Sequence, residues 1–347
     1  MADITGELLE ELGREPERRP AVLVAADLNY DYIHECPALE AGREVLIRAS
    51  SRQLAGAGGI VACGLARLGA ETHLLAEVGD DADGQELYEE IARRGVQRDG
   101  IRRRQGARSA FTLIFGEEAS GRPRQVATFQ GPSLTFTLRA QDCRPLLARC
   151  RLAYSCNYFL LPRLAEAVPE LFRLARQLGL HTAYDANAGD GWEDPGRLAL
   201  LAGGIYPVTD LIFLNQQEAA HLTERADPRG AAEAVQPPEA TVVIKCGPEG
   251  AVVRSQGATL HVDAFPLPGP LRDTVGAGDS FQAAFLYFLL CGLPVARCAV
   301  LGAANAACTV LEPGGVAGQQ DRGGLASFLR GYRVLEEREG GVRVQRA

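Results

Sequence analysis

The chain of 347 residues lacks a long hydrophobic run and an excess of positive charge. No stretch approaches the roughly 18 to 20 apolar residues that a membrane-spanning helix requires. The N-terminal ten residues are too acidic and polar for a signal peptide. Acidic residues outnumber basic ones by 44 to 36, which leaves a formal net charge of -8. Because surfaces that bind nucleic acid or membranes are basic, we expect neither partner.

Paired cysteines are absent as well. The nine cysteines make an odd number, no Cys-x-x-Cys spacing occurs, and most of them lie inside apolar segments. Such residues are typical of reduced core cysteines, so we expect a cytoplasmic protein without a disulfide framework or a zinc site. The hydrophobic share of 46% and the charged share of 23% are ordinary for an enzyme with a large core.

Short apolar runs alternate with helical patterns from residue 21 onward. The pattern predicts strands at 21–26, 72–78, 151–155, 181–185, 211–214 and 241–245, and helices at 58–68, 82–94, 162–178, 216–223, 279–291 and 295–311. Apolar strands that alternate with helices indicate a parallel sheet covered on both faces. A ligand is then expected at the carboxyl ends of the strands.

Four further runs, at 30–34, 44–49, 110–115 and 125–129, lack helices between them. They predict a small antiparallel sheet inserted in two pieces, at about 29–50 and 108–131, which acts as a lid, an oligomer interface or both. We expect one main domain at 20–330. Residues 1–19 are charged and contain proline, which predicts a loose leader or a short surface helix, and residues 331–347 are expected to form a peripheral tail.

A glycine-rich segment precedes the helical pattern that ends near Cys291. Residues 272–281 read Arg-Asp-Thr-Val-Gly-Ala-Gly-Asp-Ser-Phe, and an amphipathic run follows. Gly276 and Gly278 allow the backbone to turn its N–H groups toward one point, and the start of a helix adds unpaired N–H groups and a positive dipole end. Such a loop binds an anion, most often a phosphate. In this segment Asp279 is either a helix N-cap or a general base.

The segment from Asp273 to Phe281 resembles the C-terminal signature of the ribokinase family, the PfkB carbohydrate kinases. Other segments resemble the motifs of that family in the same order: Gly56 to Gly59 with Ala62 to Gly69, Glu77 to Gly84, Asp185-Ala-Asn187, Asn215-Gln-Gln-Glu218 and Ile244 to Gly250. The resemblance covers roughly residues 20 to 330. It implies an α/β fold, a ribokinase-like three-layer α/β/α sandwich with a mostly parallel central sheet and a small β-sheet lid. It also implies phosphoryl transfer from ATP, with Mg²⁺, to a hydroxyl of a sugar or nucleoside.

The resemblance assigns expected roles to individual residues. Asp279 would accept the proton of the attacking hydroxyl, and the N–H groups of Gly276, Ala277 and Gly278 would stabilise the phosphoryl oxygens. The nucleotide side would comprise Asn215, Glu218, Lys245, Gly247, Gly250, Thr274 and Asn305, with Asn305 against the adenine and Glu218 reaching Mg²⁺ through water. The acceptor side would comprise Asn29, Asp31, Gly56, Gly58, Gly59 and Asp279. Asp273 and the Val275 carbonyl correspond to a monovalent-cation site, such as one for K⁺.

Structural roles for several of these residues stay open from the residues alone. Asn215 and Glu218 have the spacing of a capping box. The Asn29–Asp31 segment has the composition of an Asx turn. Lys245 stands where relatives commonly carry threonine, and it can reach a phosphate or end a strand toward solvent. The small residues around Asn305 are also typical of close helix packing.

Ile60 departs from the family pattern, because relatives usually carry asparagine at that position. Isoleucine cannot hydrogen-bond a sugar hydroxyl, and an unpaired buried polar group costs about 1–3 kcal/mol. We therefore expect a different mode of acceptor binding. A sugar or sugar-like acceptor is the leading hypothesis. The alternatives are a nucleoside kinase, with an apolar wall for the base from Phe111, Phe129 and Phe136, and a non-catalytic ligand-binding protein. A homodimer formed through the lid is a further expectation.

Overall fold

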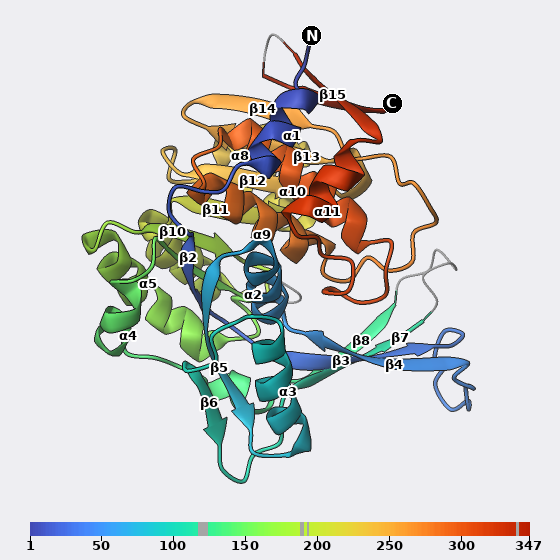
Figure 1. Ribbon diagram of the computed structural model, residues 1–347. Helices are drawn as coiled ribbons and strands as arrows, with labels where there is room; N and C mark the ends of the chain where they lie inside the picture. Colours follow the sequence, from blue (N-terminus) through green and yellow to red (C-terminus); the bar gives the residue numbers. More distant parts are fainter. Residues whose placement is uncertain (117–123, 188–190, 193, 338–339) are drawn as a thin grey trace.

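The computed structural model describes residues 1–116, 124–187, 191–192, 194–337 and 340–347. Its main sheet has 12 strands in the order β1-β15-β16-β14-β13-β12-β11-β10-β9-β2-β5-β6 (Figure 1). The part from β12 to β6 is parallel throughout. In sheet order its strands are β12 (Thr241–Lys245), β11 (Leu211–Asn215), β10 (His181–Asp185), β9 (Leu152–Cys156), β2 (Ala21–Ala25), β5 (Glu71–Gly79) and β6 (Ile101–Arg104).

Antiparallel pairing extends the sheet beyond β12. The hairpin of β13 and β14 pairs with it, and β14 then runs parallel to β16. Antiparallel β15 and β1 complete this edge. The five strands are β13 (Ala251–Ser255), β14 (Ala258–Val262), β16 (Val342–Arg346), β15 (Tyr332–Glu336) and β1 (Ala2–Asp3).

Helices cover both faces of the sheet and form two cores. The first core contains α1 (Thr5–Gly13), α2 (Ala57–Leu68), α3 (Ala82–Arg93), α9 (Ala277–Leu290), α10 (Val295–Thr309) and α11 (Arg322–Leu329). The second contains α4 (Ala140–Leu147), α5 (Pro162–Gln177), α6 (Pro195–Leu200), α7 (Gln216–Thr223) and α8 (Pro228–Ala234). Along β2, Val22 and Val24 belong to the first core and Leu23 and Ala25 to the second. This alternation confirms the predicted three-layer α/β/α arrangement.

A separate 4-stranded sheet, built from the two predicted pieces and called the lid below, projects from the main body (Figure 1). Its order is β4 (Ala49–Ala55), β3 (Asn29–Glu35), β7 (Phe111–Phe115) and β8 (Gln125–Phe129). The outer pairs are antiparallel, but β3 and β7 are parallel, so the prediction of a wholly antiparallel sheet is wrong. The reason is that β2 and β6 run in the same direction and end at the same edge of the main sheet. The lid strands β3 and β7 follow them directly and therefore start out in the same direction.

The boundary of the first inserted piece also differs from the prediction. The strand expected at 44–49 lies at Ala49–Ala55. Its sequence, Ala-Ser-Ser-Arg-Gln-Leu-Ala, is polar because its outer half is exposed on both faces, and an apolar pattern is therefore missing. The polar turn predicted between the second pair of lid strands falls largely on residues 117–123, outside the described residues.

Both chain ends belong to the fold. Of the two alternatives predicted for residues 1–19, the short helix forms and the loose leader does not, and the predicted peripheral tail contributes strands to the main sheet. β1 pairs with β15, and α1 buries Leu8 and Leu12 in the first core. Ile4 is buried beside them, four residues before Leu8. The spacing of these three residues forms one apolar stripe, which the surrounding charges obscured in the sequence. The two termini lie close together at the end of the main body in Figure 1.

The helix after the glycine-rich loop is more buried than predicted. All but one of the residues Ser280 to Leu290 of α9 are buried, so the helix is apolar on all sides instead of amphipathic. It packs between the sheet, α2 and α10 in the first core. Such a helix holds the loop at its start in a fixed position. No helix within the described ranges is long and apolar enough to cross a membrane.

Candidate active site

The carboxyl ends of the parallel strands bring predicted and unpredicted polar residues to one edge of the sheet. Asp27 follows β2, and Asn157 follows β9. Asp185, Asn215 and Lys245 are the last residues of β10, β11 and β12. Ligands of open α/β sheets bind at this edge. The lid begins here as well, because β3 starts two residues after Asp27.

The glycine-rich loop forms the start of α9. Gly276 is the N-cap residue and has a φ of 72°, a left-handed conformation that glycine adopts readily. A Cβ atom on Gly276 would lie 2.4 Å from the Cα atom of Gly315, so the loop also requires glycine for close packing. Asp279 lies in the first turn of the helix and is not its N-cap.

Several N–H groups of this loop are available for an anion. Within the described residues, the amides of Gly276, Gly278 and Asp279 donate no hydrogen bond. The Ala277 amide makes a long one of 3.4 Å to the Thr274 carbonyl. Unpaired N–H groups at a helix start attract anions through direct hydrogen bonds and the helix dipole. The geometry therefore supports the predicted anion site.

The surroundings of Asp279 favour its protonated form. Burial raises the pKa of this carboxyl to about 8, against the opposing attraction of Lys245. The carboxylates of Asp185, Asp27 and Asp31 raise the pKa further. No hydrogen bond reaches the Asp279 carboxylate from the described part of the chain, so its oxygens remain available to a ligand.

Lys245 is held beside the loop by a chain of polar contacts. Its Nζ atom lies 2.7 Å from Asp185 Oδ2, which also accepts a hydrogen bond from Gln282. The Tyr154 hydroxyl donates to Gln282 Oε1 at 2.7 Å. A Cβ atom on Gly278 would lie 3.4 Å from Lys245 Nζ. The ammonium group therefore lies against the anion loop, and the solvent-facing alternative for Lys245 is wrong.

Lys245 is also the sole lysine among the 36 basic residues of the chain. Its side chain is 16% exposed, and burial alone would lower its pKa. The attraction of Asp185, Glu218 and Asp279 outweighs that effect and raises the pKa. The amine is therefore charged, as a phosphate-binding group must be.

Asn29 and Asp31 face the site from lid strand β3. Asn29 Nδ2 donates to Thr112 Oγ1 at 3.2 Å and approaches Asp31 Oδ1 at 3.4 Å. Asn29 Oδ1 is buried without a partner among the described residues. Burial raises the pKa of Asp31 to about 7, although the hydrogen bond with Thr112 opposes that change. An unpaired acceptor beside a second carboxyl group is suited to the hydroxyl donors of a polyol.

The predicted glycines of the acceptor side have different roles. A Cβ atom on Gly56 would lie 2.7 Å from Asn29 Oδ1, so this glycine borders the acceptor side. A Cβ atom on Gly58 would lie 2.1 Å from the Cβ of Ala26, and one on Gly59 would lie 2.9 Å from Leu28 Cδ1. These two glycines therefore allow α2 to pack closely on its neighbours. The Gly58 amide also donates to Asp27 Oδ1 at 3.0 Å.

Ile60 stabilises the anion loop from behind. Its side chain is 3% exposed and belongs to the first core. A Cβ atom on Gly315 would lie 2.6 Å from Ile60 Cδ1, and Gly315 in turn packs against Gly276. The departure from the family pattern thus places an apolar contact behind the loop.

Asn215 and Glu218 form the capping box of α7. Glu218 N donates to Asn215 Oδ1 at 2.9 Å, and Asn215 N donates to Glu218 Oε2 at 2.7 Å. The capping-box alternative is therefore present in the structure. It does not exclude a role with Mg²⁺, because Glu218 lies close to Lys245 at the site and raises the pKa of that lysine. No group of three or more His, Cys, Asp or Glu side chains in the described ranges could hold a metal ion directly. A Mg²⁺ ion that keeps water and phosphate ligands does not need such a group.

Asp273 does not fit the monovalent-cation site that the resemblance implies. Its Oδ1 atom accepts hydrogen bonds from Arg124 Nη2 at 2.9 Å and from the Val275 amide at 3.0 Å. Its Oδ2 atom accepts one from the Gly314 amide at 2.9 Å. Both oxygens that would coordinate a cation therefore already accept hydrogen bonds.

The structure contradicts the role of Asn305 at the adenine. This residue is 0% exposed, its Nδ2 atom donates to the Ser280 carbonyl at 2.8 Å, and its Oδ1 atom accepts from the Gln320 amide at 2.9 Å. It joins α10 to α9 and to the segment before α11, which is the close-packing alternative.

The remaining nucleotide-side residues lie at the same edge of the sheet. Gly247 and Gly250 bound the turn between β12 and β13. A Cβ atom on Gly250 would lie 2.0 Å from the Val262 carbonyl oxygen, so packing already requires that glycine. Thr274 is exposed at the start of the anion loop.

The apolar wall suggested for a nucleoside base does not form. Phe111 pairs with Phe129, one position away from the pairing of Thr112 with Thr128. Successive residues of a strand point to opposite faces, so both phenylalanines lie on the lid face opposite Asn29 and Asp31. Phe136 is buried in the second core.

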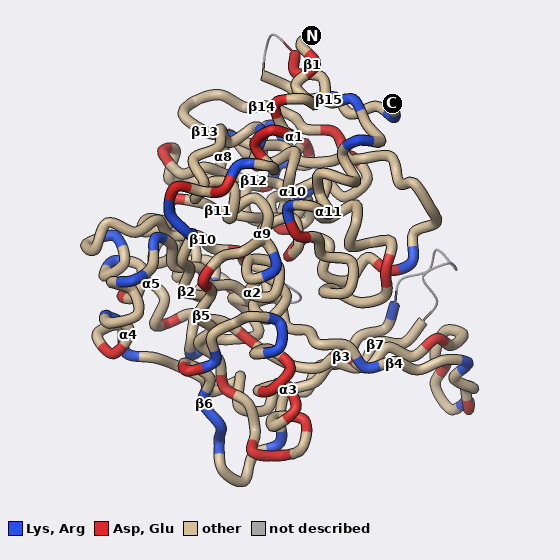
Figure 2. Tube along the Cα trace, in the orientation of Figure 1, with Lys and Arg blue, Asp and Glu red and all other residues tan. Residues whose placement is uncertain are grey.

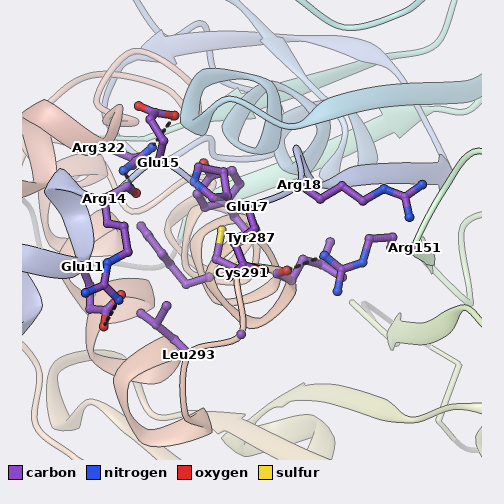
Figure 3. A pocket seen from close by; sticks show the side chains of 14 residues that line it. Glu11, Arg14, Glu15, Glu17, Arg18, Arg151, Tyr287, Cys291, Leu293 and Arg322 are labelled. Carbon is purple, nitrogen blue, oxygen red and sulfur yellow. Dashed lines mark hydrogen bonds and ion pairs between the residues drawn. The ribbon is translucent and has the colours of Figure 1, made fainter.

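A hollow of about 510 Å³ (Figure 3) lies near the amino end of β9, on the side of the sheet away from the strand ends that form the site. Its lining comes from residues 11 and 14–18, the end of α9 with Cys291 and Leu293, Arg151 and Arg322. Arg151 directly precedes β9, and its Nη1 donates to the Leu290 carbonyl at 2.7 Å. Arg322 Nε likewise donates to the Leu12 carbonyl at 3.1 Å. These two arginines join parts of the fold, and the hollow is separate from the anion loop.

Lys and Arg residues are interspersed with Asp and Glu residues over the described trace (Figure 2). Residues of both signs occur on the lid as well as on the main body.

Comparison with known proteins decides the family. A family model described as pfkB family carbohydrate kinase matches residues 20–322. The chain belongs to the PfkB family of carbohydrate kinases. It is 28% identical over 297 residues to a 2-dehydro-3-deoxygluconokinase of Bacillus subtilis, covering 84% of this chain and 90% of the relative. It is also 28% identical to a probable fructokinase-3 of Arabidopsis thaliana, covering 67% of each chain.

Solved structures support the same fold. The ribokinase of Arabidopsis thaliana, complexed with ribose and ATP, superposes with a TM-score of 0.77 at 20% identity over 90% of this chain and 99% of that chain. With the family established, this PfkB protein is a carbohydrate kinase, a phosphotransferase with a hydroxyl group as acceptor. The predicted fold and enzyme class are confirmed.

Sequence reasoning missed several polar residues at this edge. They are Asp27, Thr112, Arg124, Asn157 and Gln282. Asp27 and Asn157 each follow an apolar strand, which is a signal that could have been used. The other three carry no local signal, because their partners are distant along the chain.

Proposed function

We propose that the protein is an ATP-dependent sugar kinase in which Asp279 is the general base and the start of α9 holds the transferred phosphoryl group. One observation carries the proposal. The Asp279 carboxylate, the unpaired loop amides and the sole lysine lie together, close to the Asp31 carboxyl group of the lid. Their combination supplies a base and an anion site for the same reaction.

In the proposed reaction, the acceptor hydroxyl oxygen forms a bond to the γ-phosphorus of ATP. The bond between that phosphorus and the bridging oxygen of the β-phosphate breaks, ADP leaves with the electron pair, and the hydroxyl proton passes to Asp279. The amides of Gly276 and Gly278, with Ala277 between them, stabilise charge on the phosphoryl oxygens. When bound, Mg²⁺ offsets phosphate charge, and Asn215 and Glu218 would hold it through water.

Lys245 adds a positive charge on the same side of the loop. Asp185 fixes the ammonium group, and Gln282 and Tyr154 fix Asp185 in turn. A fixed charge costs no reorganisation when the transition state forms. Lys245 also attracts the Asp279 carboxylate and so favours the form that can accept a proton.

The acceptor would bind between the lid and Gly56. Asn29 Oδ1 and the Asp31 carboxylate accept hydrogen bonds from its hydroxyls, and Ile60 contributes none. A polyol such as a sugar or sugar acid matches this set of acceptors. A nucleoside is not favoured, because the phenylalanines lie elsewhere.

We also propose that the lid pairs with a second copy of the chain. All five residues of β8 are exposed, and β8 is an outer strand of the lid sheet. An exposed strand edge is a template for pairing. Sedimentation of the full chain should show a dimer, and a monomer at micromolar concentration would contradict this arrangement.

The test is turnover of ATP with a panel of sugars, sugar acids and nucleosides, with the phosphorylated product identified by mass spectrometry. We expect a sugar or sugar acid to be phosphorylated, and Asp279→Asn to reduce kcat by about 10²-fold or more. Asp99→Asn, at an exposed position, is the matched control and should retain full activity. Full activity of Asp279→Asn, or the absence of any phosphorylated acceptor, would overturn the proposal.

A further inference from the structure

An ion pair joins the lid to the loop that precedes the anion site. Arg124 directly precedes β8, and Asp273 lies three residues before Gly276. Arg124 Nη2 lies 2.9 Å from Asp273 Oδ1, and the two side chains are 14% and 5% exposed. The residues are 149 positions apart in the sequence. Two opposite charges that are distant in the sequence and both nearly buried must be held in a defined geometry.

The same carboxylate holds two further parts of the loop. Asp273 accepts hydrogen bonds from the amides of Val275 and Gly314. Gly314 precedes Gly315, whose Cα atom lies close behind Gly276. Asp273 therefore connects the lid, the start of the anion loop and the backbone that supports the loop from behind.

A monovalent cation at this position would compete with Arg124. Cation ligands must direct lone pairs at the ion, whereas three N–H donors are directed at the oxygens of Asp273. A second positive charge on the same carboxylate would also be repelled by the guanidinium group. The Arg124 side chain thus already supplies the positive charge that a cation would place beside Asp273.

We propose that Arg124 supplies, from the lid, the positive charge that the anion loop requires, so that this kinase needs no monovalent cation. The inference rests on the proposed function of the loop. Arg124 is a positioning residue that acts through Asp273 and does not touch the reacting atoms. Because the lid carries Arg124, the loop acquires its supporting charge when the lid is in place.

The experiment measures the initial rate at one ionic strength in potassium, sodium and tetramethylammonium chloride. The wild type should give rates within about two-fold in all three salts. Arg124→Ala should lose at least ten-fold in tetramethylammonium chloride and recover most of that loss in potassium chloride or with added guanidinium ion. Arg124→Lys should keep more activity than Arg124→Ala and respond less to potassium. Arg272→Ala, an exposed neighbour in the same region, is the matched control and should resemble the wild type.

Three outcomes would overturn the inference. They are ten-fold activation of the wild type by potassium, full activity of Arg124→Ala without potassium, and a loss in Arg124→Ala that neither cation restores. The melting temperature provides a readout that does not need turnover. Replacing tetramethylammonium by potassium should stabilise Arg124→Ala and leave the wild type unchanged. If the wild type phosphorylates no acceptor, the proposed function fails, whereas this measurement still decides whether Arg124 replaces the cation.

Discussion

Asp279 has to lose its proton to act as a base, yet its surroundings retain that proton. Burial and three neighbouring carboxylates raise its pKa to about 8, and Lys245 opposes them. A base with a pKa near the working pH combines a useful deprotonated fraction with a strong tendency to accept a proton. The same shift has a consequence for stability.

We predict that Asp279→Asn makes the ligand-free protein more stable at pH 8. The unfolded carboxyl, with an ordinary pKa of 3.8, loses its proton well before the folded one. The folded state therefore binds more protons between these values, and the free energy of unfolding falls as pH rises through this window. Differential scanning calorimetry should show a gain on the order of 1 to 3 °C at pH 8 and a smaller gain at pH 5. Asp99→Asn should show no such trend, and an equal gain at both pH values would contradict the prediction.

A second residue-scale prediction concerns Ile60. Ile60→Asn would place an amide in the first core behind Gly315, so we expect a loss of about 2–4 kcal/mol in the free energy of unfolding. Ile60→Val is the matched control and should cost about 0.5–1.5 kcal/mol. Urea denaturation measures both values. Because Ile60 faces the loop, the asparagine should not improve the KM for a sugar, and an improved KM would show that the position faces the acceptor.

At the scale of the element, the loop of α9 depends on glycine for shape and for space. Gly276→Ala would combine a left-handed φ with a Cβ atom 2.4 Å from Gly315 Cα. We expect kcat to fall by at least about ten-fold, since one misplaced oxyanion donor costs about 10²–10³ in kcat. Gly257→Ala is the control, because Gly257 has a φ of 79° but no atom within 4 Å of an added Cβ. Both variants should lose some stability, but only Gly276→Ala should lose activity.

The sequence predicted the inner elements better than the outer ones. The predicted bounds of β10, β12 and α7 agree with the structure. The interior of the buried parallel strand β12 is a continuous apolar run, and the start of α7 is marked by the spacing of its capping box. The outer strands β14 and β16 were not predicted. Their sequences, Ala-Thr-Leu-His-Val and Val-Arg-Val-Gln-Arg, carry polar residues on an exposed face, and a strand with one exposed face needs only half of its residues to be apolar.

The site residues also divide into those that the sequence predicted and those that it did not. Local motifs located the anion loop, Asp279 and the residues at the strand ends. The pairing of Arg124 with Asp273 and the contact of Gln282 with Asp185 could not be predicted, because each joins segments that only the tertiary fold brings together. The same lack of tertiary information led to the wrong role for Asn305, whose small neighbours indicated packing as much as a ligand.

At the scale of the whole molecule, the chain ends close the first core. We predict that Leu8→Ala costs about 2–5 kcal/mol of stability, because Leu8 is 0% exposed in α1. Glu10→Ala, on the exposed side of the same helix, should change the stability by less than about 0.5 kcal/mol. Chemical denaturation provides the comparison. Equal stabilities of the two variants would mean that α1 is not part of the cooperative unit.

The central claim is that Asp279 accepts the hydroxyl proton beside a charged Lys245. The most direct measurement is the pH dependence of kcat/KM, which reports the pKa of the free enzyme. We predict that the wild-type value rises with pH to a midpoint near 8, in line with the pKa of Asp279. Lys245→Met removes the opposing charge and should move the midpoint to higher pH, whereas Lys245→Arg should leave it near the wild-type value. A profile that is flat from pH 6 to 9, or a midpoint that Lys245→Met moves to lower pH, would contradict the account.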